Sequence, residues 1–229
     1  RLGASYMSNK YGTRCFTSAE EAQGVFGGNA GEQWTAAKGA CHDFEDELYG
    51  GAAPSLETTG SMSGGNDNSK YFGSILLKHE NGIMPRTYAD KQGLRLGLDQ
   101  NIGSKFILSL GGDILHNLND RGLSNNENNG SPPQAAYSSM PSFIDYRGQC
   151  PNGSRVTDPG NPCAGVVYPS TAPYAFSNPF QTVALLLNKE IVWREIMTGH
   201  ADYNALSTPK NTLRFSANGG GDIFTQKNA

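Results

Sequence analysis

The chain has no long apolar run, no Cys-x-x-Cys pair and no excess of charge of one sign. Because no stretch of 18 or more residues is apolar, no segment is predicted to be a transmembrane helix. The 18 basic and 21 acidic residues leave a net charge of −3 without a clustered basic patch, so nothing indicates nucleic-acid binding. A membrane barrel is not excluded, because a barrel strand needs only about 9–11 residues with every second one apolar.

Motifs of the common enzyme and metal sites are also missing. No nucleophile-elbow, phosphate-loop or dinucleotide motif occurs. The four histidines are scattered over separate segments, which favours polar histidines over metal ligands: His42, His79, His116 and His200. No spacing supports a carboxylate pair of Asp113 and Asp222, and the acidic or Asn-rich stretches 125–129 and 158–161 lack a calcium-loop pattern. We therefore predict no enzyme activity, no catalytic residue, no metal and no cofactor.

Glycine and asparagine are abundant instead, with 29 glycines in 229 residues. Both residues favour turns and positive φ. Hydrophobic residues make up only 37% and the mean hydropathy is −0.49, whereas an aromatic content of 10% argues against a disordered chain. The composition indicates β structure with many turns and long polar loops.

Four cysteines lie in polar, turn-rich stretches, as two pairs: Cys15 with Cys41, and Cys150 with Cys163. We predict two disulfides within loops, which implies an oxidising compartment. The alternative of four free thiols in a cytosolic protein stays open, because sequence alone cannot fix disulfide connectivity.

Three stretches alternate with a period of two, at 92–100, 104–117 and 211–224. One alternating set is apolar: Leu94, Leu96, Leu98, Phe106, Leu108, Leu110, Leu213 and Phe215. The set between them includes charged residues: Arg95, Asp99, Asp113, Arg214 and Asp222. A helix would need a period of 3.6, so these stretches predict strands with two chemically different faces. Three consecutive glycines at 219–221 indicate a bulge or close backbone packing within the last strand.

Further strands are expected at 2–7, 55–63, 70–79 and 192–204, which gives at most seven. Short turns at 64–68, 102–105 and 207–210 alternate with long connections at 10–54, 80–90 and 118–190. Helices are expected at 18–26, with Ser18 as N-cap, and at 181–188. Short and long connections in alternation are typical of an up-and-down outer-membrane barrel. A structureless loop as long as 118–190 would be unusual in a compact soluble domain.

A series of short motifs resembles the barrel of SusC/RagA-type TonB-dependent transporters. The first is Ser61-Met-Ser-Gly-Gly65 followed by Asn66-Asp-Asn-Ser-Lys-Tyr-Phe72, similar to that family's Ser-Gly-Gly-x-x-x-x-x-Tyr-Phe hairpin. Further pieces follow in the same order, at 80–83, 94–100, 121–126, 141–145, 178–181, 192–194 and 217–222. Their order over residues 55–228 carries the resemblance, and the two cysteine pairs are not part of it.

The resemblance implies a segment of a 22-stranded, plugged transmembrane barrel with long extracellular loops. Residues 1–229 would then be a partial barrel domain, with the plug domain and the remaining strands absent. Because a membrane tolerates no open sheet edge, the rest of a longer polypeptide or other chains would complete the wall. The implied function is import of a large nutrient, an oligosaccharide or a peptide, across the bacterial outer membrane. The implied partners are the rest of the barrel, the plug, membrane lipid, TonB and a SusD-like lipoprotein.

In such a barrel the apolar set faces lipid and the charged set faces the lumen, because a lipid-facing arginine costs about 2–4 kcal/mol at the bilayer midplane. Tyr71, Trp193 and Tyr203 would form an aromatic girdle. The alternative is a secreted, disulfide-stapled all-β binding or adhesion module, in which these aromatic residues would lie in the core. A secreted hydrolase, the third class, has no supporting motif.

Overall fold

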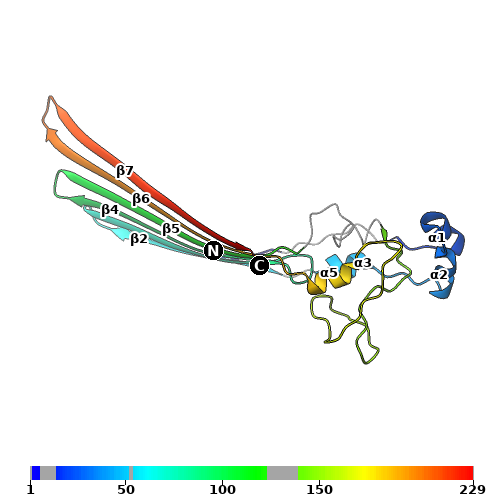
Figure 1. Cartoon of the computed structure of the whole chain (residues 1–229). Helices are drawn as coiled ribbons and strands as arrows, with labels where there is room; N and C mark the ends of the chain where they lie inside the picture. The colour runs from blue at the N-terminus through cyan, green and yellow to red at the C-terminus, as the bar shows by residue number, and fades with distance from the viewer. Residues whose placement is uncertain (1, 6–13, 52–53, 123–138, 229) are drawn as a thin grey trace.

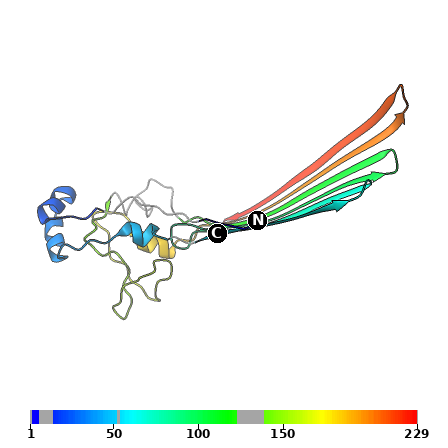
Figure 2. The same cartoon turned by 180° about the vertical axis from the view of Figure 1, so that it is seen from behind.

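The chain forms one long antiparallel sheet with a body of loops and short helices beyond one of its ends (Figures 1 and 2). The computed structural model describes residues 2–5, 14–51, 54–122 and 139–228. The seven strands lie side by side in chain order: β1 (Leu2–Ser5), β2 (Ser55–Gly65), β3 (Ser69–Asn81), β4 (Tyr88–Ile102), β5 (Phe106–Asp120), β6 (Lys189–Ser207) and β7 (Thr212–Asn228). Within the described residues β1 and β7 do not pair with each other, so the up-and-down sheet is open.

The predicted fold class, all-β with an antiparallel up-and-down sheet, is confirmed, and a strand is found at each of the seven expected places. Several strands are longer than the alternation indicated. β4 pairs with β5 from Tyr88 opposite Asp120 to Ile102 opposite Phe106. The outer ends of these strands carry polar side chains on both faces, so backbone pairing continues there without an apolar pattern to reveal it.

Three short turns join the strands at the end far from the loops. In the β2–β3 turn, the Asn66 side-chain oxygen accepts hydrogen bonds from the backbone N–H of Asn68 at 2.8 Å and of Ser69 at 2.9 Å. Gly65 has a φ of 143°, and a Cβ there would lie 2.0 Å from the Ser69 carbonyl oxygen. Only glycine fits this position, which agrees with the predicted tight turn.

At the opposite end, residues 14–51, 82–87 and 139–188 form what we call the loop body. It contains four helices: α1 (Ala19–Phe26), α2 (Ala30–Ala36), α3 (Phe44–Tyr49) and α5 (Pro179–Leu185). Ser18 caps α1 by accepting a hydrogen bond from the Glu21 backbone N–H, as predicted. α5 begins earlier than expected, because Asn178 caps it and Pro179 occupies its first turn. No described helix is long and apolar enough to cross a bilayer.

The loop body has an apolar core of its own, built from all three long connections. Phe44, Met84, Tyr146 and Phe180 are each at most 6% exposed and pack in one cluster. The rings of Phe44 and Phe180 meet edge to face with their centroids 6.0 Å apart. The expectation of a structureless loop is therefore wrong for residues 139–188, which fold onto α3 and onto the β3–β4 connection.

Two disulfides close loops within this body, in the pairing expected from the sequence. Cys15 is bonded to Cys41 across a separation of 26 residues, and Cys150 to Cys163 across 13. The first bond spans α1 and α2, beside a second cluster that includes Phe16, Ala22 and Phe143. Each bond limits the freedom of its loop when the loop is unfolded.

The Glu21 carboxylate in the first turn of α1 should make the stability of this helix depend on pH. The Glu21 carboxylate accepts hydrogen bonds from the Thr17 backbone N–H and from Arg14, which lowers its pKa to about 2. A lowered pKa stabilises the folded form at neutral pH, and this contribution is lost as the pH falls from about 4.5 towards about 2. We expect hydrogen exchange of the α1 amides to accelerate over this interval, and Glu21→Gln to abolish the change. An unaltered acid profile in the Gln variant would contradict it.

Candidate functional site

The strand register divides the side chains of the sheet between two faces. Residues directly opposite one another on paired strands share a face, and neighbours along a strand alternate. Leu98 is paired with Leu110, and Phe106 with Tyr203, which is in turn paired with Phe215. The register extends this apolar face to all eight residues of the predicted lipid-facing set: Leu94, Leu96, Leu98, Phe106, Leu108, Leu110, Leu213 and Phe215. That they contact lipid remains a prediction.

The apolar face lies open. Leu96 is 53% and Leu110 46% exposed, although both belong to inner strands that are paired on each side. The loop body lies beyond the end of the strands (Figure 1), so no described segment packs across this face. A contiguous apolar surface over several strands marks an interaction site rather than an ordinary solvent face.

Aromatic residues border the apolar face at both ends. Tyr71 and Tyr203 lie towards the short turns, and Trp193 lies towards the loop body, stacked on His116 with ring centroids 4.2 Å apart. Trp193 and Tyr203 are ten residues apart on β6. At about 3.3 Å per residue and a tilt of roughly 40°, they would bound a band about 25 Å tall, which matches the apolar belt of a membrane barrel. One carboxylate, Glu195, interrupts the band next to Trp193.

The opposite, polar face carries the five predicted lumen-facing residues: Arg95, Asp99, Asp113, Arg214 and Asp222. Arg95 donates to Asp113 on the neighbouring strand at 2.6 Å. Cross-strand pairing of this kind neutralises charges while leaving their remaining hydrogen-bonding groups in water.

Two further ion pairs join charges on this face. Asp222 accepts from Arg194, at 3.0 Å from Nε and 2.6 Å from Nη2. Arg214 pairs with Asp202, whose other oxygen accepts from Ser216 at 2.5 Å. Asp202 is only 2% exposed, which makes it the most deeply buried charge on this face among the described residues. Asp202 alternates with Ala201 and Tyr203 along β6, so its place on the polar face follows from the sequence. Its partners Arg214 and Ser216 follow only from the register between β6 and β7.

The candidate histidines His79 and His200 lie apart from each other, and so do the carboxylates of Asp113 and Asp222. His79 lies on the apolar face and binds Asp90, whereas His200 lies on the polar face near the short turns. Asp113 and Asp222 are separated by Ile196 on the strand between them. Within the described part of the chain, no group of three potential metal ligands occurs.

The outcome for the remaining sequence candidates is mixed. Asp158 closes a local turn by accepting from the Gly160 N–H, which agrees with a solvated turn, and residues 125–129 lie outside the described residues. Gly219 to Gly221 continue the β6–β7 ladder without a shift in register, so they do not form a bulge. A Cβ at Gly220 would lie 2.9 Å from the Met197 carbonyl oxygen, which agrees with the other expectation, close backbone packing. The irregularity lies between Asn204 and Leu206 instead. On the apolar face, Gly199 and Gly219 leave a shallow hollow of about 650 Å³.

Charged side chains join the connections of the loop body. Arg147 donates to both oxygens of Asp145 at 2.9 Å and lies 3.8 Å from Glu47 of α3. Burial would raise the pKa of Asp145, but the hydrogen bonds from Arg147 outweigh it and lower that pKa. Burial raises the pKa of Glu47. Arg147 therefore links the first and third long connections at the edge of the apolar core.

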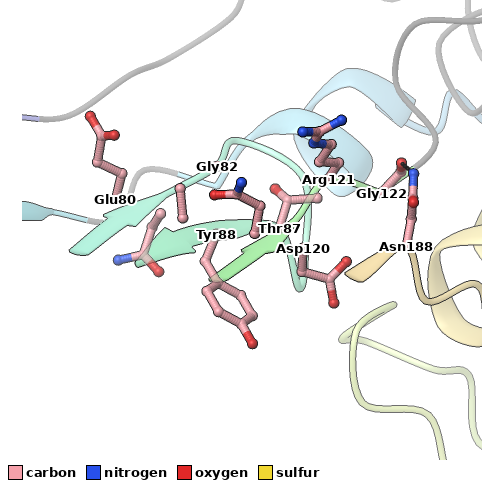
Figure 3. A pocket seen from close by; sticks show the side chains of 11 residues that line it. Glu80, Gly82, Thr87, Tyr88, Asp120, Arg121, Gly122 and Asn188 are labelled. Atoms are coloured by element: carbon pink, nitrogen blue, oxygen red, sulfur yellow. Dashed lines mark hydrogen bonds between the residues drawn. The ribbon is translucent and has the colours of Figure 1, made fainter. Parts of the chain in front are cut away.

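A polar pocket of about 510 Å³ lies where the sheet meets the loop body (Figure 3). Glu80 and Arg121 stand up on one side of the strands, whereas Tyr88 and Asp120 point to the other side (Figure 3). The register places Glu80 on the polar face, opposite Ala89. The motifs at 80–83 and 121–126 include five of its lining residues, but the sequence did not indicate that they form a pocket, because its walls come from three different strands.

No family model and no curated protein matches the chain.

The resemblance to SusC/RagA-type transporters therefore rests on the short motifs alone. Those motifs fall on the elements that form the two faces: Ser61–Phe72 spans the β2–β3 turn, and residues 94–100 and 217–222 lie within β4 and β7.

Proposed function

We propose that this sheet is part of the wall of an outer-membrane β-barrel, in a TonB-dependent transporter of the SusC/RagA type that imports a large nutrient. The observation that carries the proposal is the uncovered apolar face, with aromatic residues at both borders of a band about 25 Å tall. Lipid is the partner that matches a face of this height. The proposed role is binding and passage of a solute, not bond chemistry.

The free energy involved is large. Fully burying one large apolar side chain is worth about 1.5–3 kcal/mol. Six of the eight residues of the predicted lipid-facing set are 37–59% exposed, and leaving them so in water would forfeit on the order of 5–10 kcal/mol, comparable with the whole stability of an ordinary domain. Contact with hydrocarbon removes this penalty, and the paired charges of the opposite face keep their water.

The open edge of β7 indicates what else the wall needs. β7 runs for 17 residues, Thr212–Asn228, and pairs only with β6 among the described residues. In hydrocarbon each unsatisfied backbone group costs several kcal/mol. An antiparallel strand, from the same polypeptide or from another chain, should therefore continue the sheet on this side.

The transporter class follows from the motif series over residues 55–228, and the implied partners follow with it. A SusD-like lipoprotein would cap the end that carries the loop body, and TonB would act from the end with the short turns. The polar face would line the interior and contact the plug. These partners are proposals that accompany the family resemblance.

A secreted, disulfide-stapled binding module is the second candidate, and one observation favours it. The loop body has its own apolar core and contains both disulfides. A secreted binding module would be expected to have the same two features. Such a module would need a second layer to cover the apolar face in water. Remaining in solution without detergent, as a single species, would favour this candidate over the barrel wall.

Cysteine labelling tests the membrane orientation. Single cysteines at Leu96 and Arg95 in the native polypeptide, in cells, would be treated with a water-soluble thiol reagent. We expect position 95 to react and position 96 to be protected, because the two side chains point to opposite faces. The reverse pattern would mean that the faces are swapped, and equal reaction at both would mean that β4 does not cross a membrane.

A further inference from the structure

The hollow on the apolar face is an apolar groove along the middle of β6. Its lining runs from Met197 to Ala201, which is about 13 Å at 3.3 Å per residue. Gly199 and Gly219 lie opposite each other in its floor, and Leu110 stands beside them on β5. Because the floor lacks side chains, its volume of about 650 Å³ has room for an apolar chain that lies along the strands.

A carboxylate lies at the end of the hollow nearer to the loop body. Glu195 is two residues from Met197 on β6, and Ile114 and Ile223 flank it on the neighbouring strands. Trp193, at the border of the apolar face, is two residues further on, so Glu195 lies about 5 Å inside this border. No described residue forms a hydrogen bond or an ion pair with its side chain. A carboxylate in hydrocarbon needs a donor, and here the donor has to come from outside the described residues.

Lys227 lies on the other side of this border from Glu195. It is paired with Ile191, which is two residues beyond Trp193 towards the loop body. Thr225, the neighbouring residue of β7 on this face, is opposite Trp193. Tryptophan lies at the headgroup level of bilayers, so these two side chains lie where lipid phosphates are. An ammonium group and a hydroxyl group can both donate to phosphate oxygens, and Lys227 forms no ion pair with any described residue.

These two polar points restrict the kind of lipid. Lys227 and Glu195 are four residues apart in register, which is about 10 Å along the membrane normal at a tilt of roughly 40°. Below its phosphate, a glycerophospholipid has only ester oxygens, which accept hydrogen bonds and cannot donate to Glu195. The ammonium group of phosphatidylethanolamine lies on the water side of its phosphate. A lipid with amide N–H or hydroxyl groups between its phosphate and its acyl chains can bind both side chains.

We propose that this surface binds a phosphorylated glycolipid of the outer leaflet that has at least one acyl chain attached through an amide bond. Its phosphate binds Lys227 and Thr225, an amide or hydroxyl group beneath the sugar donates to Glu195, and one acyl chain lies in the hollow. Trp193 packs between the two polar contacts, at the level of the sugar. This inference rests on the proposed function, because the apolar face has to contact lipid with the loop body on the outer side.

Native mass spectrometry of the native polypeptide in detergent tests the proposal with two lipids. Diphosphoryl lipid A has amide and hydroxyl groups beneath its phosphates, whereas phosphatidic acid has a phosphate above ester bonds alone. We expect lipid A to bind at least tenfold more tightly than phosphatidic acid. Equal affinities for the two lipids, or no retained lipid A, would overturn the proposal.

Two substitutions separate the polar contacts. Lys227→Gln should weaken the binding of both lipids at least fivefold, because both carry phosphate. Glu195→Leu should weaken lipid A binding at least fivefold without weakening that of phosphatidic acid, because only lipid A donates to this carboxylate. Lys91→Gln removes a lysine from the polar face near the same end of the sheet and should change neither. Normal lipid A binding by Glu195→Leu, or equal effects of the two lysine variants, would overturn the assignment.

Filling the hollow tests the place of the acyl chain. A Cβ at Gly219 would meet no atom within 4 Å, so Gly219→Leu should fold normally and weaken lipid A binding at least fivefold. Gly73→Leu, on the same face of β3, is the control. A Cβ there would lie 3.6 Å from Met62 and 3.7 Å from Leu96, which are ordinary contacts, and lipid A binding should stay the same. Equal effects of the two variants would overturn the hollow as the acyl-chain site.

The cysteine labelling at positions 95 and 96 is repeated on the same polypeptide, so that the two proposals can fail separately. The expected labelling together with no preference for lipid A rejects the glycolipid site but not the barrel wall. Reversed or equal labelling rejects the wall and, with it, the glycolipid site.

Discussion

Replacing Phe180 with alanine should unfold the loop body while leaving the sheet intact. Phe180 lies on α5, is 2% exposed, and packs edge to face on Phe44 of α3. Removing a buried phenylalanine side chain costs about 3–5 kcal/mol, through lost contacts and the cavity left behind. Because the core joins three separate connections, this loss should release α3 and the third connection together.

Hydrogen exchange followed by mass spectrometry measures the effect. Since 1.4 kcal/mol corresponds to a factor of ten, amides of α3 and α5 should exchange at least a hundredfold faster in the variant. Amides in the centre of β4 and β5 should keep their protection.

The chain provides a matched control four residues away. Phe176 is 90% exposed, so Phe176→Ala removes the same side chain from the same connection without opening a cavity, and exchange should stay within a factor of about three. If both variants behave alike, or if β4 loses protection with α5, the loop body is not a separate unit with its own core.

The strands could be predicted because their two faces differ chemically over long stretches. A period of two survives in β4, β5 and β7 because one face is apolar and the other polar. The helices of the loop body carry much weaker local signals. α3 is only six residues long, although Asp43 caps it by accepting from the Asp46 N–H. α2 contains Gly31, whose N–H is held by the Gln23 side chain from α1, and such a tertiary contact cannot be seen in sequence spacing.

The candidate site could be predicted only in part, for a related reason. The face of each residue follows from odd or even position along its own strand, so all thirteen face assignments were accessible. Which charges pair depends on the register between strands, and the irregularity between Asn204 and Leu206 sets that register for β6 and β7. With this register, Arg214 forms an ion pair with Asp202, and Arg194 forms one with Asp222. The polar pocket depends on three strands at once and left no local pattern.

An arginine at position 110 should destabilise the protein in lipid far more than an arginine at position 109. Leu110 lies at the centre of the apolar stretch of β5, between Phe106 and Ile114, and Ser109 is the next residue on the opposite face. If the apolar face meets lipid, Leu110→Arg should lower the free energy of unfolding by about 2–4 kcal/mol. Ser109→Arg should change it by less than about 1 kcal/mol, because the new charge stays hydrated on the polar face.

Urea unfolding of the native polypeptide in lipid vesicles, followed by tryptophan fluorescence, compares the two variants under identical conditions. The pair is informative because both substitutions add the same side chain to the same strand at nearly the same depth, so their difference isolates the face. Since a register slip of one residue would exchange the two faces everywhere, a larger loss for Ser109→Arg would reverse every assignment made for the sheet. Equal losses would mean that neither face contacts hydrocarbon, and the band between Trp193 and Tyr203 would then have to be covered by protein.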